Sequence, residues 1–173
     1  MEQDKEKLAI KQEENIFLDH KEKKNTKSLL TFMLSNENYC VEMQEAKQVI
    51  PLRQIAKIPN SPGFIIGAMN FQGDIIIIMD IRYFFKLREI EKTEKQMVIV
   101  TDIAGFLTGI LVDKITGTVE LEEDLIQPAL ATIDEKLALY VKGQAQIQDN
   151  IFALLDLKKI LTNEEITNLE KGE

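Results

Sequence analysis

The sequence is poor in the residues that build covalent or metal-centred chemistry. Its 173 residues include one cysteine, Cys40, and one histidine, His20. A single cysteine excludes an intramolecular disulfide and a cysteine-based zinc site, and it favours a reducing compartment. His20 lies in a lysine-rich stretch near the N-terminus, so the part expected to fold has no imidazole to act as a general base. Most hydrolase mechanisms are thereby excluded.

Long apolar runs and positive net charge are missing as well. The purest apolar run, Ile75 to Met79, has five residues, whereas a membrane-spanning helix needs about 20. The start, Met1 to Lys11, is charged and lacks the apolar core of a signal peptide. A net charge of −8 repels phosphate backbones and anionic lipids. We therefore predict a cytoplasmic protein that binds neither nucleic acid nor membrane directly.

What the sequence does contain is a β pattern. From Ser28 onward, short β-branched and aromatic runs alternate with turn residues, about five per half of the chain. Glycine supplies the positive φ of a tight turn in the strongest hairpin, at Gln72-Gly73. The expected strand pairs are 29–34 with 39–43, 66–71 with 75–79, 97–101 with 106–112, and 137–141 with 151–155. The predicted fold class is all-β.

An internal repeat is the most informative feature of the sequence. Phe64 to Asp80 aligns without a gap on Tyr140 to Asp156, which matches Gly67 to Gly143, Gln72 to Gln148 and Asp80 to Asp156. An apolar and basic stretch typical of a short helix follows each copy. Because one such strand pair is only marginally stable, we expect two small barrels that share a core or an interface.

The repeat and the composition suggest four segments. Residues 1–27 carry seven acids and seven bases with few apolar side chains, which predicts a flexible charged tail. Residues 28–92 and 93–161 are expected to form the first and second β-barrels. Residues 162–173 are expected to form a C-terminal helix that packs on the body, since Thr162 and Glu165 fit a capping box.

No group of side chains makes a convincing catalyst. Asp80 and Asp156 are better explained as helix N-caps than as a catalytic carboxylate pair. Cys40 fits a small buried hydrophobe. The acidic run Glu120 to Asp124 lacks the spacing of a calcium loop. We predict a protein that is not an enzyme and has no cofactor or metal; a small-molecule enzyme or ligand sensor would need a polar pocket that nothing in the sequence predicts.

A possible docking surface follows Glu42, where the period of two fails. Met43, Ala46 and Val49 recur every three residues, which turns one apolar row around a bend. A partner protein could cover this row. Alternatively, the three side chains pack into the core of the first barrel. The sequence leaves both interpretations open.

The ordered series of motifs resembles the CheW family of bacterial chemotaxis coupling proteins over about 140 residues. The resemblance is carried by Tyr39-Cys40-Val41-Glu42, Ile58-Pro59-Asn60-Ser61-Pro62, Phe64 through Gly67, Asp80-Ile81-Arg82, Gly109 through Asp113, Ile126-Gln127-Pro128 and Leu161 through Glu165. It implies two SH3-like five-stranded barrels and a non-catalytic adaptor for chemotaxis signal transduction. The implied partners are the regulatory domain of the histidine kinase CheA, the cytoplasmic tips of chemoreceptors and other CheW-like domains in rings.

The resemblance also implies two groups of contact residues. The kinase-facing patch of the first barrel falls on Leu30, Met43, Ala46 and Val49. The receptor-facing groove between the barrels falls around Gln48, Gly67, Gln72 and Met97.

The chain departs from the family at one informative pair. Gln48 and Gln72 stand where the family usually has a glutamate and an arginine, and Ile77 stands where it often has a proline. Two glutamines can hydrogen-bond to each other, so the local structure is expected to persist, whereas the charge offered to a receptor is lost. This departure leaves a second hypothesis, a paralogue that binds the kinase or the array but has weak or altered receptor binding.

Overall fold

Strands dominate the computed structural model, which describes residues 24–88, 93, 95–103, 105–129 and 138–162. The strands are β1 (Thr26–Leu34), β2 (Glu37–Glu42), β3 (Gln48–Pro51), β4 (Ile65–Phe71), β5 (Asp74–Met79), β6 (Met97–Ile103), β7 (Phe106–Val112), β8 (Lys114–Glu122), β9 (Ile126–Gln127), β10 (Val141–Ile147) and β11 (Asn150–Leu155). The helical turns are η1 (Met43–Glu45), α2 (Arg82–Phe85), η2 (Glu123–Leu125) and α4 (Leu157–Leu161). The all-β prediction with short helices is therefore confirmed.

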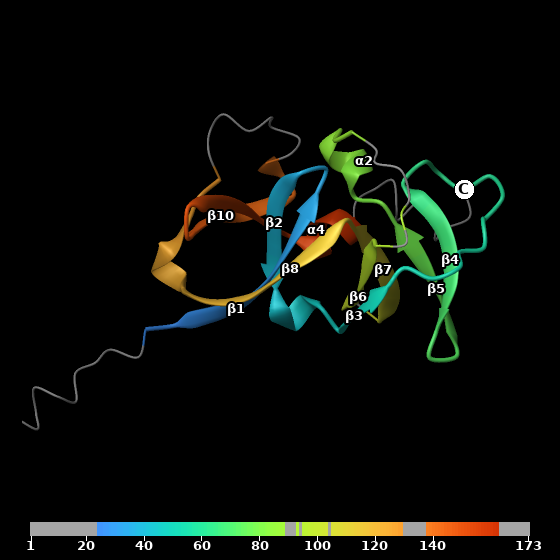
Figure 1. The fold of residues 1–173 in the computed structure, drawn as a ribbon, viewed down its shortest axis with the longest axis horizontal. Coiled ribbons are helices and arrows are strands. Elements are labelled where there is room, and N and C mark those ends of the chain that lie inside the picture. The colour runs from blue at the N-terminus through green and yellow to red at the C-terminus, as the bar shows by residue number, and fades with distance from the viewer. Residues whose placement is uncertain (1–23, 89–92, 94, 104, 130–137, 163–173) are drawn as a thin grey trace, which may run out of the picture.

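The strands form two sheets, which lie side by side in Figure 1. The five-stranded sheet has the order β3-β6-β7-β5-β4, and an antiparallel bridge between Ala56 and Ala68 joins its two ends. The six-stranded sheet has the order β8-β1-β2-β11-β10-β9. Its ends are joined because β8 continues through η2 into β9, which pairs with β10. Each sheet thus closes on itself, which leaves no free edge between these end strands.

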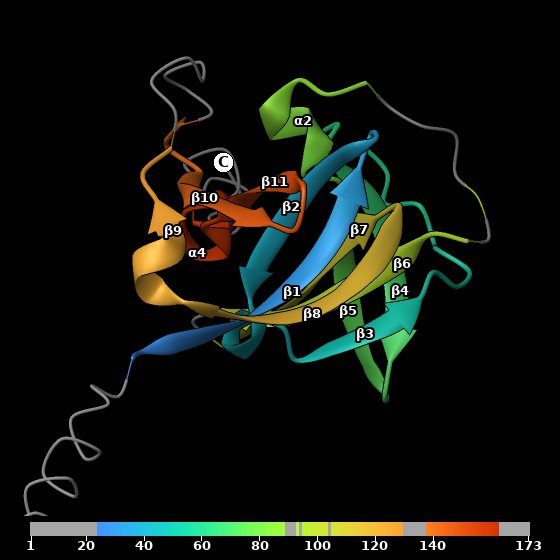
Figure 2. The same ribbon diagram turned by 60° about the vertical axis from the view of Figure 1, so that its left-hand side comes forward.

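The barrels do not follow the predicted ranges 28–92 and 93–161. The five-stranded barrel is built from residues 48–112, whereas the six-stranded barrel combines β1 and β2 with β8 to β11. Hairpin β1-β2 pairs with β8 on one side and β11 on the other, as Figure 2 shows. Hairpin β6-β7 pairs in the same way with β3 and β5. Each hairpin therefore joins the strands of the other half of the chain.

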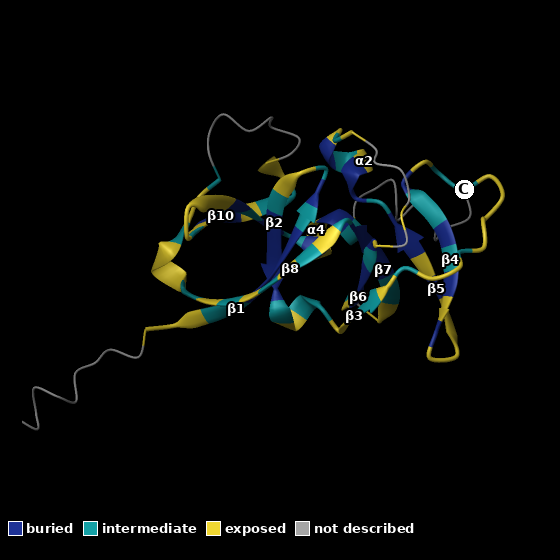
Figure 3. Cartoon of the chain, viewed as in Figure 1, coloured by how far each residue is buried: buried dark blue, intermediate teal, exposed yellow. Residues whose placement is uncertain are grey.

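Three apolar cores hold this arrangement together, and their residues form the dark blue interior in Figure 3. One core fills each barrel, and the third lies between them. Neighbouring residues of β1 serve different cores, because Leu29 points into the six-stranded barrel and Leu30 into the shared core. The shared core contains Leu30, Phe32, Leu34, Tyr39, Val41, Ile81, Phe85, Ile99, Ile110, Val112, Leu155, Leu157 and Ile160. The expectation of two barrels that share a core is confirmed.

The internal repeat is visible in backbone detail. In both copies the strand register shifts immediately before the glycine that approaches the barrel-closing segment, between Ile65 and Gly67 in β4 and between Val141 and Gly143 in β10. The two glutamines of the turns, Gln72 and Gln148, both adopt φ 54°. Asp156 caps α4 by accepting a hydrogen bond from the Lys159 amide at 2.9 Å, as predicted.

Asp80, its counterpart in the first copy, is not the predicted N-cap, because Ile81 holds that position in α2 and the Asp80 carboxylate binds Arg82 instead. It accepts hydrogen bonds from the backbone amide of Arg82 at 3.1 Å and from Nε of the same residue at 2.8 Å. Arg82 is 1% exposed, and its Nη1 donates to Oδ1 of Asp113 at 2.7 Å. Asp113 lies where the chain crosses from β7 to β8, and Gln96 and Ser35 also donate to it. This polar cluster ties α2 to the crossing between the barrels.

The structure corrects the predicted end of the tail and the predicted strand over 137–141, and it does not describe the C-terminal helix. The first strand begins at Thr26, because residues 26 and 27 pair with β8, so the predicted tail is too long at its end. The strand expected over 137–141 lies instead at β10, over Val141–Ile147. Residues 1–23 of the tail and 163–173 of the C-terminal helix lie outside the described residues. Within the described part, no helix has the length and apolar character needed to cross a membrane.

Candidate partner-binding surface

The segment that links the two sheets after β2 carries the apolar row found in the sequence. The chain leaves the six-stranded sheet at Glu42, makes the single turn η1 and enters the five-stranded sheet at Gln48. Met43, Ala46 and Val49 are partly exposed and also pack against the shared core. The row therefore packs against the core on one side and is accessible to a partner on the other, so both interpretations of the sequence hold in part.

Leu30, the fourth residue of the expected kinase-facing patch, lies elsewhere. It is 3% exposed and belongs to the shared core. Both faces of β1 are covered at this point, because Leu29 fills the barrel while Leu30 faces the other barrel. Leu30 can support the surface from below but presents almost no area to a partner.

The four expected receptor-facing residues differ in exposure: two are exposed, Met97 is partly buried and Gly67 is buried. Gln48 and Gln72 are exposed, and Nε2 of Gln72 donates a hydrogen bond to Oε1 of Gln48 at 3.0 Å, as expected from their chemistry. Met97 packs against the shared core and pairs with Pro51 at the end of β3. Gly67 is buried against Ala56.

Gly67 has a clear structural role. A Cβ at this position would lie 2.3 Å from Cγ2 of Ile55 and 2.4 Å from the carbonyl oxygen of Ala56, and the backbone has φ +151°. Glycine is therefore required where the bridge closes the five-stranded barrel. Of the four expected receptor contacts, the structure places only Gln48 and Gln72 together at the surface.

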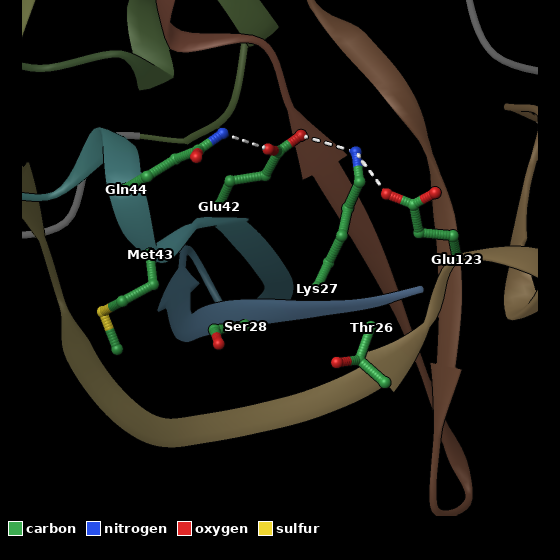
Figure 4. A pocket seen from close by; sticks show the side chains of 7 residues that line it. All are labelled: Thr26, Lys27, Ser28, Glu42, Met43, Gln44 and Glu123. Carbon is green, nitrogen blue, oxygen red and sulfur yellow. Dashed lines mark hydrogen bonds and ion pairs between the residues drawn. The ribbon is translucent and has the colours of Figure 1, made fainter. Parts of the chain in front are cut away.

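Charged side chains surround η1. Nζ of Lys142 lies 3.3 Å from Oε1 of Glu42 and 3.2 Å from Oε1 of Glu45. Figure 4 shows Glu42 between Lys27, at 3.1 Å, and the amide of Gln44, at 2.8 Å. Burial raises the pKa of Glu42, but the two lysines outweigh it and the net shift is downward. Glu42 is thus held ionised beside the apolar row.

A hollow opens next to this ionic group. It has a volume of about 580 Å³, and Thr26, Lys27, Ser28 and Glu123 line it together with the start of η1. The lining side chains, drawn in Figure 4, are mostly polar and come from β1, β2, η1 and η2. Lys27 lies between the carboxylates of Glu42 and Glu123.

A second apolar surface was missed in the sequence. Ile75 is 79% exposed, Phe106 56% and Ile77 41%, and a hollow of about 470 Å³ lies beside them. The run of four isoleucines from Ile75 to Ile78 could have indicated this exposed surface. In a strand of this kind alternate side chains face outward, so two of the four had to be on the surface unless another element covered them.

The described residues show little that could drive catalysis. Cys40 is fully buried, and burial raises the pKa of its thiol to about 12, which keeps it protonated and inert. Among the residues described, no group of three or more histidine, cysteine, aspartate or glutamate side chains could hold a metal ion. The described surface instead presents two apolar areas and a pair of polar side chains on the double barrel.

These features define the class as a double β-barrel protein with a shared apolar core. The CheW-like domain model matches residues 28–165, so the chain belongs to the CheW family. It is 29% identical over 137 residues to the chemotaxis protein CheW of Klebsiella aerogenes, covering 79% of this chain and 82% of that protein. The CheW of Thermotoga maritima is 26% identical over 141 residues, covering 80% and 89%.

A solved structure agrees with the fold. The scaffolding protein TtCheW of Thermoanaerobacter tengcongensis superposes with a TM-score of 0.73 at 26% identity, covering 84% of this chain and 94% of that one. The two-barrel architecture implied by the resemblance is therefore confirmed.

Proposed function

We propose that this protein is a non-catalytic adaptor that couples chemoreceptors to the histidine kinase CheA in bacterial chemotaxis arrays. Membership of the CheW family supports this proposal, as does the character of the surface at η1. The observation that carries it is the row Met43, Ala46 and Val49, which is partly exposed although it rests on the shared core. Such a row offers a partner apolar area without local rearrangement.

In this proposal the two groups of residues serve two partners. Met43, Ala46 and Val49 contact the regulatory domain of CheA, and Leu30 supports them from the core. Gln48 and Gln72 face the receptor tip, with Met97 and Gly67 behind them. The adaptor works in the cytoplasm, at the receptor arrays. Fixing the kinase relative to the receptor lets a small receptor displacement bias the conformational equilibrium of the kinase.

Binding measurements test this assignment directly. The wild-type protein is expected to bind both the regulatory domain of CheA and a receptor-tip fragment in calorimetric titrations. Ala46→Arg should weaken kinase binding about ten-fold or more, because a charged side chain then has to be buried against an apolar partner surface. The melting temperature should stay nearly unchanged, since Ala46 is only partly buried.

The matched control is Thr118→Arg, which adds the same side chain at an exposed position of β8. Its kinase binding should equal that of the wild type. Absence of wild-type binding to both partners would overturn the proposed function. A large loss of stability in Ala46→Arg would instead show that Ala46 acts mainly as core.

The second candidate function is a paralogue that binds the kinase or the array rings but meets ordinary receptors poorly. The hydrogen bond between Gln48 and Gln72 favours it, because the two side chains satisfy one another without any net charge. An arginine would offer a receptor carboxylate a charged, bidentate donor that glutamine cannot replace.

Restoring the charges separates the two candidates. If charge is what receptor binding lacks, Gln48→Glu combined with Gln72→Arg should tighten binding to a receptor-tip fragment about ten-fold. Kinase binding should not change. The control, Gln48→Arg combined with Gln72→Glu, keeps an ion pair but reverses it and should bring no gain. Unchanged receptor affinity in the first variant would contradict this account of the pair.

A further inference from the structure

The turn η1 is too short to hold its own orientation. It spans Met43–Glu45 and contains no buried residue, and the Ala46 amide closes it by donating to the Met43 carbonyl at 3.1 Å. From outside the turn, the Thr101 hydroxyl donates to the Glu45 carbonyl at 2.6 Å. A single 3₁₀ turn of this kind gains little from internal hydrogen bonds. The direction in which Met43 and Ala46 face must therefore depend on contacts from other elements.

Two carboxylates mark the ends of the turn. Glu42 precedes it and Glu45 closes it, and their side chains are 11% and 14% exposed. The Glu45 carboxylate also folds back over the turn, because its Oε2 accepts a hydrogen bond from the backbone amide of Glu42 at 3.3 Å. Without a cation between them, two largely buried carboxylates would repel each other and distort the turn.

Lys142 supplies that cation. Its Nζ lies 3.3 Å from Glu42 and 3.2 Å from Glu45, and in the described part of the chain it is the one lysine that reaches both. Lys27 reaches Glu42 at 3.1 Å, but its other carboxylate partner is Glu123 at 3.9 Å, as Figure 4 shows. Lys27 therefore cannot replace Lys142 at the Glu45 end of the turn.

The lysine lies at the register shift of β10, between Val141 and Gly143. It belongs to β10, next to Gly143, where a Cβ would lie 2.5 Å from the carbonyl oxygen of Gln127. Burial lowers the pKa of Lys142, but Glu45 and Glu42 more than offset this and the net shift is upward. The ammonium is therefore charged where it contacts the two carboxylates at the ends of the turn.

We propose that Lys142 is a positioning residue of the partner-binding surface: its ammonium joins Glu42 to Glu45 and thereby sets how η1 presents Met43 and Ala46. This inference deepens the proposed function and rests on it. Lys142 does not contact the partner itself in this proposal. Its effect on binding passes through the geometry of the turn.

The test compares Lys142→Met, which keeps the length of the side chain but removes the charge, with Lys142→Arg, which keeps the charge. Lys142→Met should weaken binding to the CheA regulatory domain roughly five-fold and speed hydrogen exchange of the Ala46 amide. Lys142→Arg should restore most of the affinity. Lys158→Met, at an exposed lysine of α4, should change neither measurement.

A double-mutant cycle with Glu45→Gln tests whether the loss of CheA binding in Lys142→Met arises from the contact between Lys142 and Glu45. The double variant Lys142→Met, Glu45→Gln should bind no more than about two-fold more weakly than the weaker single variant, because both changes break the same contact. Wild-type affinity in Lys142→Met, or no rescue by arginine, would overturn the inference. If the wild type does not bind CheA, the proposed function fails, while the exchange rate of Ala46 still decides whether Lys142 holds the turn.

Discussion

Arg82 is the charged side chain with the deepest burial in the described structure. It is 1% exposed and lies between Asp80, at 2.8 Å, and Asp113, at 2.7 Å. Gln96 donates a further hydrogen bond to Asp113 at 2.9 Å. A buried cation with two carboxylates is costly to desolvate, so its net contribution to stability is modest as long as it is intact. Removing the arginine is strongly destabilising, because the two carboxylates then keep their charges without a cation.

Arg82→Met should therefore destabilise the protein by about 3 kcal/mol, because Asp80 and Asp113 lose their cation while they remain only 18% exposed. Denaturant unfolding measures this change. The control is Lys159→Met, which breaks an ion pair to Asp156 at 3.9 Å from a lysine that is 66% exposed. A surface pair of this kind contributes about 0.5 kcal/mol or less. Equal effects of the two substitutions would contradict the role given to burial.

Individual residues of the site were predictable to different degrees. The contact between Gln48 and Gln72 could be expected because both positions differ from a charged pair in the family, and their amides are complementary. The burial of Leu30 could not, because β1 is apolar on both faces and its alternation does not indicate which residue meets solvent. The contact of Lys142 with the turn could not be predicted, since the two lie about 100 residues apart in the sequence.

At the scale of elements, the closing contact of each barrel depends on one glycine. Gly67 approaches Ala56 in the five-stranded barrel, and Gly143 approaches Gln127 in the six-stranded barrel. The two positions align in the sequence repeat, so the same geometric solution occurs twice. The backbone of the closing segment passes where a side chain would otherwise stand.

Gly143→Ala should destabilise the protein by about 2 kcal/mol, because its Cβ would lie 2.5 Å from a backbone oxygen that cannot rotate away. Thermal unfolding followed by circular dichroism measures the loss. Gly63→Ala is the matched control, since its Cβ meets the flexible ring of Tyr83 at 3.4 Å, an ordinary contact distance. If Gly143→Ala were as stable as Gly63→Ala, the closure of the barrel would not depend on this approach.

Local elements were predicted well where turn chemistry and alternation agreed. The hairpin around Gln72-Gly73 has both turn residues at positive φ, at 54° and 99°. The hairpin of β1 and β2 turns at Ser35 and Asn36, which also have positive φ. The expected strand over 137–141 was wrong because β10 begins only at Val141, and Leu139, which precedes it, is 61% exposed. An apolar run alone does not distinguish a strand from the segment that leads into it.

At the scale of the whole molecule, the number of barrels was predictable but the pairing between distant strands was not. Alternation identifies the face of a strand and a tight turn identifies its neighbour in the chain. Neither indicates that β2 pairs with β11, or that β5 pairs with β7. Both of these pairings are parallel and join distant segments, so only the structure shows that residues 48–112 form a barrel inserted into the other one.

This insertion sets the order in which the molecule can be completed during synthesis. The ribosome releases β1 and β2 first, yet their sheet neighbours β8 and β11 emerge only after the whole five-stranded barrel has been made. The middle of the chain is thus the earliest part able to close; β1 then gains β8, and the edge of β2 stays unpaired until β11 emerges. A nascent chain that stalls before β8 holds one finished barrel and a hairpin with neither of its sheet neighbours.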